Sequence, residues 1–145
     1  MDLKVENMTL DDLNNIKDIL ISDFDDFWTF NTLEEELKCT NSFFLVAKND
    51  DNEIVGFAGI KAILDEADIM NIVVKKSFRG HGIGSKLLEN LILFAKKHNL
   101  KTVTLEVNET NLSAIKLYNK FNFNKVGIRK KYYDGKNDAI IMNFT

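Results

Sequence analysis

The stretch that decides the fold begins Ile69-Met70-Asn71-Ile72-Val73-Val74, a mostly apolar run rich in β-branched residues that is typical of a buried strand. The loop Arg79-Gly80-His81-Gly82-Ile83-Gly84 follows shortly after this run. A helix is predicted next, because apolar side chains then recur at helical spacing through residue 98: Ile83, Leu87, Leu88, Leu91, Ile92 and Ala95. A strand, a glycine-rich loop and a long amphipathic helix therefore follow one another without a break.

The glycine-rich loop predicts an anion site, most plausibly for a phosphate or pyrophosphate. Its three glycines at alternate positions allow a sharp turn that points successive N–H groups at one spot, beside a helix N-terminus. A nucleotide-binding P-loop would need Gly-Lys-Ser/Thr, whereas Gly84 is followed by Ser85 and Lys86. A dinucleotide fingerprint would need Gly or Ala at position 85, and too little chain remains for that fold.

Composition places the chain among ordinary globular proteins. Its 145 residues are 45% hydrophobic and 28% charged, which predicts a single domain over residues 1–145. Neither a membrane span nor a signal peptide is visible, so we expect a cytoplasmic protein without a membrane partner. Cys39 is the only cysteine, and His81 and His98 are isolated, so no disulfide and no metal site are expected.

Charge is distributed unevenly along the chain. Residues 1–70 hold 17 acidic residues against 5 lysines, whereas residues 71–145 hold 14 basic residues against 5 acidic ones. Either the two halves interleave in space and the imbalance means little, or a basic surface for a polyanionic cofactor lies beside an acidic surface for a cationic substrate. Nucleic acid is disfavoured as a partner, because the total charge is −3 and exposed-looking aromatic residues do not accompany the basic ones.

The remaining pattern predicts seven strands and four helices. Strands are expected at residues 3–6, 42–48, 53–63, 68–74, 102–107, 123–133 and 139–144. Thr9 and Asp12 mark the start of a helix that uses Leu13, Ile16, Ile19 and Leu20, and a second helix is expected from about Thr32 with Glu34, Glu35 and Glu36 in its first turn. Asn111 opens a helix that ends at Phe121. The order β-α-α-β-β-β-α-β-α-β-β predicts an α/β layout, often filed as α+β, with helices on both faces of a mixed sheet.

Arg79, Gly82 and Gly84 match the pattern R/Q-x-x-G-x-G/A after an apolar strand, which resembles the acetyl-coenzyme A signature of the GNAT superfamily of N-acetyltransferases. The order of elements fits that superfamily over nearly the whole chain, and its sheet is mostly antiparallel. The resemblance implies that acetyl-coenzyme A is the co-substrate and that amides from Gly80 to Ser85, including His81 and Ile83, hold its pyrophosphate. It also implies that Ile72, Val73 and Val74 pair with the pantetheine arm, where a strand amide polarises the thioester carbonyl.

Three residues outside the loop are candidates for chemistry. Glu106 shares a strand face with Thr102 and Thr104, and it is either a functional acid or a solvent-facing one. Asn111 reads first as a helix N-cap, although its side chain could serve the cofactor instead. Tyr118 lies seven residues beyond Asn111, on nearly the same line of the helix, where a tyrosine is usually a packed ring with a solvated hydroxyl.

The segments around these residues, together with the tail Arg129-Lys130-Lys131-Tyr132-Tyr133 and Asp138-Ala139-Ile140-Ile141-Met142, resemble the RimI-type branch of the superfamily. That branch acetylates the N-terminal amine of a ribosomal protein. The resemblance implies that Glu106 is the general base, Tyr118 the general acid and Asn111 a cofactor contact. The implied acceptor is the N-terminal alanine of a small-subunit ribosomal protein or a similar terminus.

The chemistry fits those roles. An α-amine has a pKa of about 8 against about 10.4 for a lysine, so an N-terminus is the easier amine to deprotonate at neutral pH. The expected reaction is direct attack in a ternary complex, without an acyl-enzyme on Cys39. Two alternatives stay open: a GNAT acetyltransferase for a small amine, polyamine or lysine side chain, and a non-catalytic acetyl-coenzyme A-binding module. The presence of both Glu106 and Tyr118 argues against the module, which would need neither.

The region around Trp28 departs from the branch pattern, which often has proline before this tryptophan, where this chain has Phe27. Residues 23–30 are expected to border the substrate entrance, with Phe27 and Trp28 binding the acceptor. Asp23, Asp25 and Asp26 either face a cationic peptide terminus or form a solvated acidic turn.

Overall fold

The computed structural model describes residues 2–24, 28–133 and 135–145. Its strands are β1 (Lys4–Asn7), β2 (Ser42–Lys48), β3 (Ile54–Ile63), β4 (Glu66–Val74), β5 (Thr102–Asn108), β6 (Asn124–Tyr133) and β7 (Asn137–Phe144). Its helices are α1 (Leu10–Asn15), α2 (Phe30–Leu37), α3 (Ile83–Lys97) and α4 (Leu112–Lys120), with short turns η1 (Lys17–Ile19), η2 (Leu20–Phe24) and η3 (Lys76–Phe78). The predicted order of strands and major helices is confirmed.

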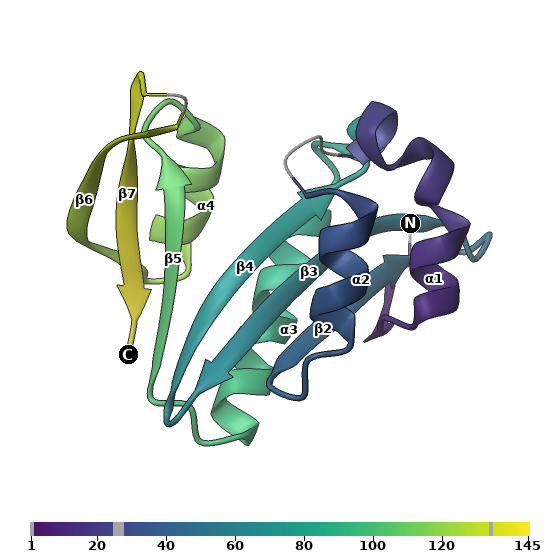
Figure 1. The fold of residues 1–145 in the computed structure, drawn as a ribbon, viewed down its shortest axis with the longest axis horizontal. Coiled ribbons are helices and arrows are strands. Elements are labelled where there is room, and N and C mark those ends of the chain that lie inside the picture. Colours follow the sequence, from purple (N-terminus) through teal and green to yellow (C-terminus); the bar gives the residue numbers. More distant parts are fainter. Residues whose placement is uncertain (1, 25–27, 134) are drawn as a thin grey trace.

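The strands form one mixed sheet in the order β1-β2-β3-β4-β5-β7-β6. All neighbouring strands are antiparallel except β4 and β5, which are parallel and pair only over three positions, from Glu66 with Thr102 to Asp68 with Thr104. Beyond those pairs the two strands diverge, so that the sheet opens into a V whose arms are β1–β4 and β5–β7 (Figure 1). The predicted mostly antiparallel seven-stranded sheet is confirmed.

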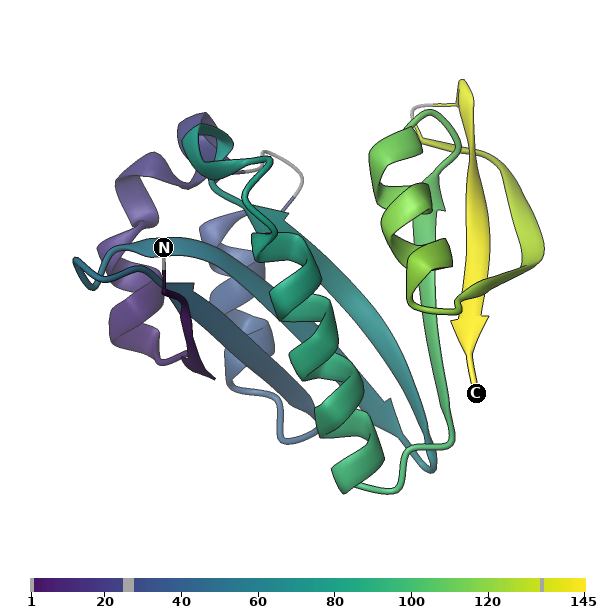
Figure 2. The same cartoon turned by 180° about the vertical axis from the view of Figure 1, so that it is seen from behind.

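Helices cover both faces of the sheet. The views in Figures 1 and 2 place α1 and α2 over one face of the β1–β4 arm and α3 over the other, while α4 covers the β5–β7 arm. The predicted apolar stripe of α3 is fully buried against the sheet, with Leu87, Leu88 and Leu91 each 0% exposed. A second core lies between the sheet and the α1–α2 layer, around Leu13, Phe24 and other apolar residues.

The N-terminal helical region differs from the prediction. Thr9 and Asp12 form the expected capping box, since each side chain accepts a hydrogen bond from the other residue's backbone N–H. The prediction of a continuous helix after them is wrong, because α1 ends before Ile16. The chain continues as a 3₁₀ turn and then a π turn. The apolar positions still face the second core, so burial is preserved although the helix is interrupted.

Several element boundaries also differ, and those of α2 and β4 have a clear physical reason. Helix α2 is capped by Thr29 and begins at Phe30, so the glutamates at 34–36 lie beyond its first turn rather than in it. A Thr side chain that accepts the N–H of Thr32 fixes this earlier start. Strand β4 begins two residues before the prediction and carries a bulge at Met70, because Ile60 pairs with Ile69 whereas Gly59 pairs with Asn71.

Candidate active site

Three adjoining cavities occupy the cleft where β4 and β5 diverge. The outer cavity, of about 250 Å³, lies nearest the paired ends and is lined by Trp28, Asp68, Ile69, Met70, Thr104, Leu105, Glu106, Tyr132 and Tyr133. The central cavity, of about 260 Å³, shares several of these residues and adds Asn71, Ile72, Val73, Val107, Asn108, Asn111 and Tyr118. The loop cavity, of about 510 Å³, is lined by Ile72, Val73, Val74, Arg79, Gly80, Gly84, Asn111, Ser113, Ala114, Leu117 and Tyr118.

The glycine-rich loop has the geometry expected of an anion cradle. Gly80 and Gly82 have φ of +84° and +78°, a left-handed conformation that favours glycine. Gly82 is the N-cap of α3 and provides no side-chain cap, so N–H groups in the first turn of the helix are left for a ligand. A Cβ on Gly84 would point between Val74 and Leu117, two residues of the loop cavity.

The other loop residues contribute in different ways. The Arg79 guanidinium donates to the carbonyl oxygens of Val74 and Phe24, each at 3.4 Å, and so ties the loop to the end of β4 and to η2. The His81 ring contacts the Phe78 carbonyl oxygen at 2.9 Å, and the Ile83 side chain is buried in the core. The His81, Ile83 and Ser85 side chains do not line the loop cavity, which leaves their backbone amides as the groups available to an anion.

The two walls of the cleft bring strand β4 opposite helix α4. Ile72, Val73 and Val74 line the loop cavity on one side, and Asn111 and Tyr118 line it on the other. Asn111 is the N-cap that the sequence predicts, because its Oδ1 accepts from Ala114 N–H at 3.2 Å. It therefore caps α4 while bordering both the central and the loop cavities.

Tyr118 stands where the central and loop cavities meet. Its ring packs against Phe123, with 5.9 Å between the ring centroids. Burial raises the pKa of Tyr118 to about 12, with the nearby Tyr133 contributing. The hydroxyl is therefore protonated throughout the neutral range and is available as a donor to a group in the cleft.

Glu106 lines the central and outer cavities from β5, on the same arm of the sheet as α4 and Tyr118. The predicted alternation along β5 is confirmed, because Val103, Leu105 and Val107 are buried while Glu106 faces the cleft with a side chain 28% exposed. Its carboxylate forms an ion pair with Arg129 at 2.8 Å. The guanidinium of Arg129 lies over the Tyr132 ring, 4.8 Å from its centroid.

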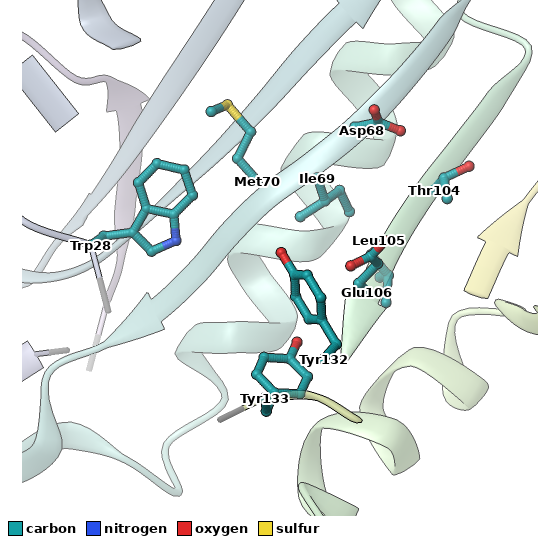
Figure 3. A pocket seen from close by; sticks show the side chains of 9 residues that line it. All are labelled: Trp28, Asp68, Ile69, Met70, Thr104, Leu105, Glu106, Tyr132 and Tyr133. Atoms are coloured by element: carbon teal, nitrogen blue, oxygen red, sulfur yellow. The ribbon is translucent and has the colours of Figure 1, made fainter. Parts of the chain in front are cut away.

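Figure 3 shows the outer cavity with Trp28 and Met70 on one side and Glu106, Tyr132 and Tyr133 on the other. Trp28 therefore borders the cleft, as the sequence predicts. Phe27, Asp25 and Asp26 lie outside the described residues.

Sequence reasoning gave no site role to several residues that line this cleft. Tyr133 is the clearest, because burial raises its pKa and the charge of Glu106 raises it further. Asp68, Met70 and Asn71 on β4 were also missed. The available signal was the sequence of the tail, which pointed to a function without placing its tyrosines beside Glu106.

Two further observations concern metal ligands and membrane-spanning helices. Within residues 2–24, 28–133 and 135–145, no group of three or more His, Cys, Asp or Glu side chains is arranged to hold a metal ion. No helix in the described part of the chain has the length and apolar character needed to cross a membrane.

A glycine-rich loop at a helix N-terminus, an open strand edge and a cleft lined by a carboxylate and a buried tyrosine hydroxyl are features suited to a group-transfer enzyme. Residues 13–123 match the Acetyltransferase (GNAT) family. The chain belongs to the GNAT family of acetyltransferases, and the fold that the sequence predicted is confirmed.

Relatives with assigned activities point to one branch of that family. The chain is 35% identical over 140 residues, 95% of its length and 92% of the other, to a Bacillus subtilis protein provisionally named a ribosomal protein bS18-alanine N-acetyltransferase. It is 38% identical over 119 residues, 79% of its length and 80% of the other, to the Haemophilus influenzae ribosomal protein bS18-alanine N-acetyltransferase. The crystal structure of the Escherichia coli ribosomal-protein-S18-alanine N-acetyltransferase superimposes with a TM-score of 0.89 at 31% identity, covering 99% of this chain and 93% of that one.

Proposed function

We propose that this protein transfers the acetyl group of acetyl-coenzyme A to the N-terminal α-amine of a protein, with the N-terminal alanine of ribosomal protein bS18 as the first candidate acceptor. The observation that carries the proposal is the cleft between β4 and β5, which joins the anion-binding loop to Glu106 and Tyr118. The relatives named for bS18-alanine acetylation support the choice of acceptor. A ribosomal protein as acceptor implies action in the cytoplasm.

Acetyl-coenzyme A fits the loop side of the cleft. The exposed amides between Gly80 and Ser85 would bind the pyrophosphate, with Gly80 and Gly82 providing the left-handed turns that aim them. The edge of β4 from Ile72 to Val74 borders the same cavity and is unpaired toward β5, so its backbone can bind an extended pantetheine arm. Asn111 borders this path on the other wall.

The acceptor then approaches from the outer cavity, on the side of Trp28 and Glu106. Glu106 removes a proton from the α-ammonium group, directly or through a water molecule, and the free amine attacks the thioester carbonyl carbon. The C–N bond forms, the C–S bond breaks and the sulfur leaves as a thiolate, while the nitrogen releases its second proton to solvent so that the product is a neutral amide. Tyr118 donates its hydroxyl hydrogen toward that sulfur, which is possible because its raised pKa keeps the hydroxyl protonated.

The ion pair with Arg129 occupies the carboxylate of Glu106, the group proposed to receive the acceptor amine. In the free protein the guanidinium of Arg129 balances the Glu106 charge and stacks on Tyr132. A cationic N-terminus that enters the outer cavity offers the same charge to the same carboxylate. The acceptor amine therefore competes with Arg129 for Glu106, and Arg129 is exposed enough to swing away, with a side chain 55% exposed.

The test is an acetyl-transfer assay with acetyl-coenzyme A and a peptide that carries the first residues of bS18, beginning with alanine. Mass spectrometry should show the addition of one acetyl group, and fragmentation should place it on the N-terminal residue. The matched control is the same peptide with its N-terminus already acetylated, which keeps any lysine side chain available. Transfer to spermidine or to lysine but not to the free N-terminus would contradict the proposal, and binding of acetyl-coenzyme A without any transfer would favour a binding module.

A further inference from the structure

Asn71 is a buried polar side chain whose amide has no hydrogen-bond partner in the part of the chain that the structure describes. It is 9% exposed, and neither its Nδ2 nor its Oδ1 forms a hydrogen bond within the described residues. Burying an amide without hydrogen bonds costs stability, and native proteins rarely keep such a group without a use for it. This unpaired amide lies in the middle of β4, beside the bulge at Met70 and on the wall of the central cavity.

Strand register places Asn71 on the same side of the sheet as Glu106. Asn71 pairs with Gly59, where an added Cβ would collide with the Phe44 ring at 2.4 Å, and Phe44 belongs to the core under α1 and α2. Glu106 also points to this side, because its neighbours Leu105 and Val107 pack into the opposite core. Cofactor-side groups such as Tyr118 belong to that opposite layer.

No hydrogen bond to a described residue fixes the orientation of the Asn71 amide, so rotation of the side chain toward the central cavity breaks none. Glu106 and Asn71 both line that cavity, although they come from different arms of the V. The Asn71 amide therefore offers one hydrogen-bond donor and one hydrogen-bond acceptor on the side of the cleft where the acceptor polypeptide is proposed to bind.

We propose that Asn71 binds the first residue of the acceptor polypeptide, with Nδ2 donating to the carbonyl oxygen of that residue and Oδ1 accepting from its α-amine. This inference rests on the proposed function and makes it more specific. A carbonyl next to the amine-bearing carbon is what separates an N-terminus from a lysine side chain or a polyamine. A carboxamide supplies one donor and one acceptor side by side, which matches a carbonyl and an amine on the same residue.

The experiment compares two acceptors on wild-type enzyme and variants. One is the alanine-starting peptide, and the other is the same peptide with its first peptide bond replaced by a trans-alkene, which keeps the shape but removes the carbonyl. The ratio of kcat/KM for the normal peptide to kcat/KM for the alkene peptide should be about 10- to 100-fold larger in the wild-type enzyme than in Asn71→Leu. Comparing the two enzymes cancels the intrinsic difference in reactivity between the two amines.

Asn14→Leu is the matched control, because it makes the same substitution at an exposed residue of α1 outside the three cavities, so it should keep the wild-type preference. Asn71→Leu should also melt at the same or a higher temperature, since it removes an unsatisfied polar group, and Asn71→Ala serves as a second variant. Equal preferences in wild type and both Asn71 variants would overturn the assignment. If the wild-type enzyme acetylates no peptide, the proposed function itself fails.

Discussion

At the scale of single residues, the site depends on an acid and a tyrosine that the fold holds in different protonation states. Glu106 forms an ion pair with Arg129, whereas burial raises the pKa of Tyr118 to about 12. One group is therefore suited to accept a proton and the other to donate a hydrogen bond. Both positions followed from sequence patterns, but their partners Arg129 and Tyr133 did not, since neither is near them along the chain.

Glu106→Gln should lower kcat for the alanine-starting peptide by about 100-fold or more, because the amide cannot take the proton from the α-ammonium group. The dissociation constant for acetyl-coenzyme A should change little, since Glu106 does not line the loop cavity. Steady-state kinetics and calorimetry measure the two quantities. Glu89→Gln, an exposed carboxylate on α3, is the control, and a wild-type kcat in Glu106→Gln would assign the base elsewhere.

Tyr118→Phe should reduce kcat by about 10- to 100-fold while acetyl-coenzyme A binding and thermal stability stay near wild type. The ring that packs on Phe123 is kept and only the donor to the leaving sulfur is lost. Because burial raises the pKa of Tyr118 to about 12, its ionisation should add no alkaline fall in rate between pH 7 and 10 in the wild type. Tyr132→Phe is the matched control, and equal rates for the two variants would remove Tyr118 from the acid role.

At the scale of elements, helix α1 illustrates how a local signal and a tertiary contact combine. Asp12 closes the capping box with Thr9 and also forms an ion pair with Lys48 of β2 at 3.0 Å, so it fixes both the start of the helix and its place on the sheet. Burial would raise the pKa of Asp12, but the Thr9 hydrogen bond and the charge of Lys48 outweigh it and leave the pKa below the ordinary 3.8.

Asp12→Ala should therefore lower the free energy of unfolding at pH 7 by about 1–2 kcal/mol. A lowered pKa in the folded state means that the carboxylate stabilises the fold above its unfolded pKa and stops doing so as the pH falls through its folded pKa. The difference in free energy of unfolding between wild type and Asp12→Ala should accordingly narrow below about pH 3.8. Urea unfolding at several pH values measures it, with Asp11→Ala, an exposed acid in the same turn, as control. A gap independent of pH would contradict the role of the charge.

Elements were predictable where their signals are local. The stripe of α3 and the Asn111 cap of α4 follow from residues that contact one another within a few positions. The break after α1 and the earlier start of α2 were not predicted. The apolar spacing of α1 and its continuation is compatible with a regular helix, and only packing against the sheet requires the change to tighter and wider turns.

At the scale of the whole molecule, the candidate site lies where the pairing between β4 and β5 is interrupted. Strands β4 and β5 pair over three residues and then diverge. Beyond those pairs, the central and loop cavities lie between the two strands in place of a ladder of hydrogen bonds. Helix α3 packs on the β1–β4 arm and α4 on the other, so the two walls of the cleft belong to separate layers of helix (Figure 2). The cleft lies where these layers part, which is also where the acetyl donor and the amine are proposed to meet.

The amino-acid sequence by itself determined the order of strands and main helices, the left-handed turns of the glycine-rich loop and the residue types available for chemistry, because glycine conformations, helix caps and apolar periodicity act over a few neighbouring residues. Only the tertiary structure decided which of these residues share a cavity. It joined Glu106 to Arg129, brought Tyr118 and Glu106 to one cavity and left the buried Asn71 amide without a hydrogen-bond partner among the described residues. Those relations depend on how distant strands pair in the sheet and on where β4 and β5 diverge, and local patterns of residue type do not specify either.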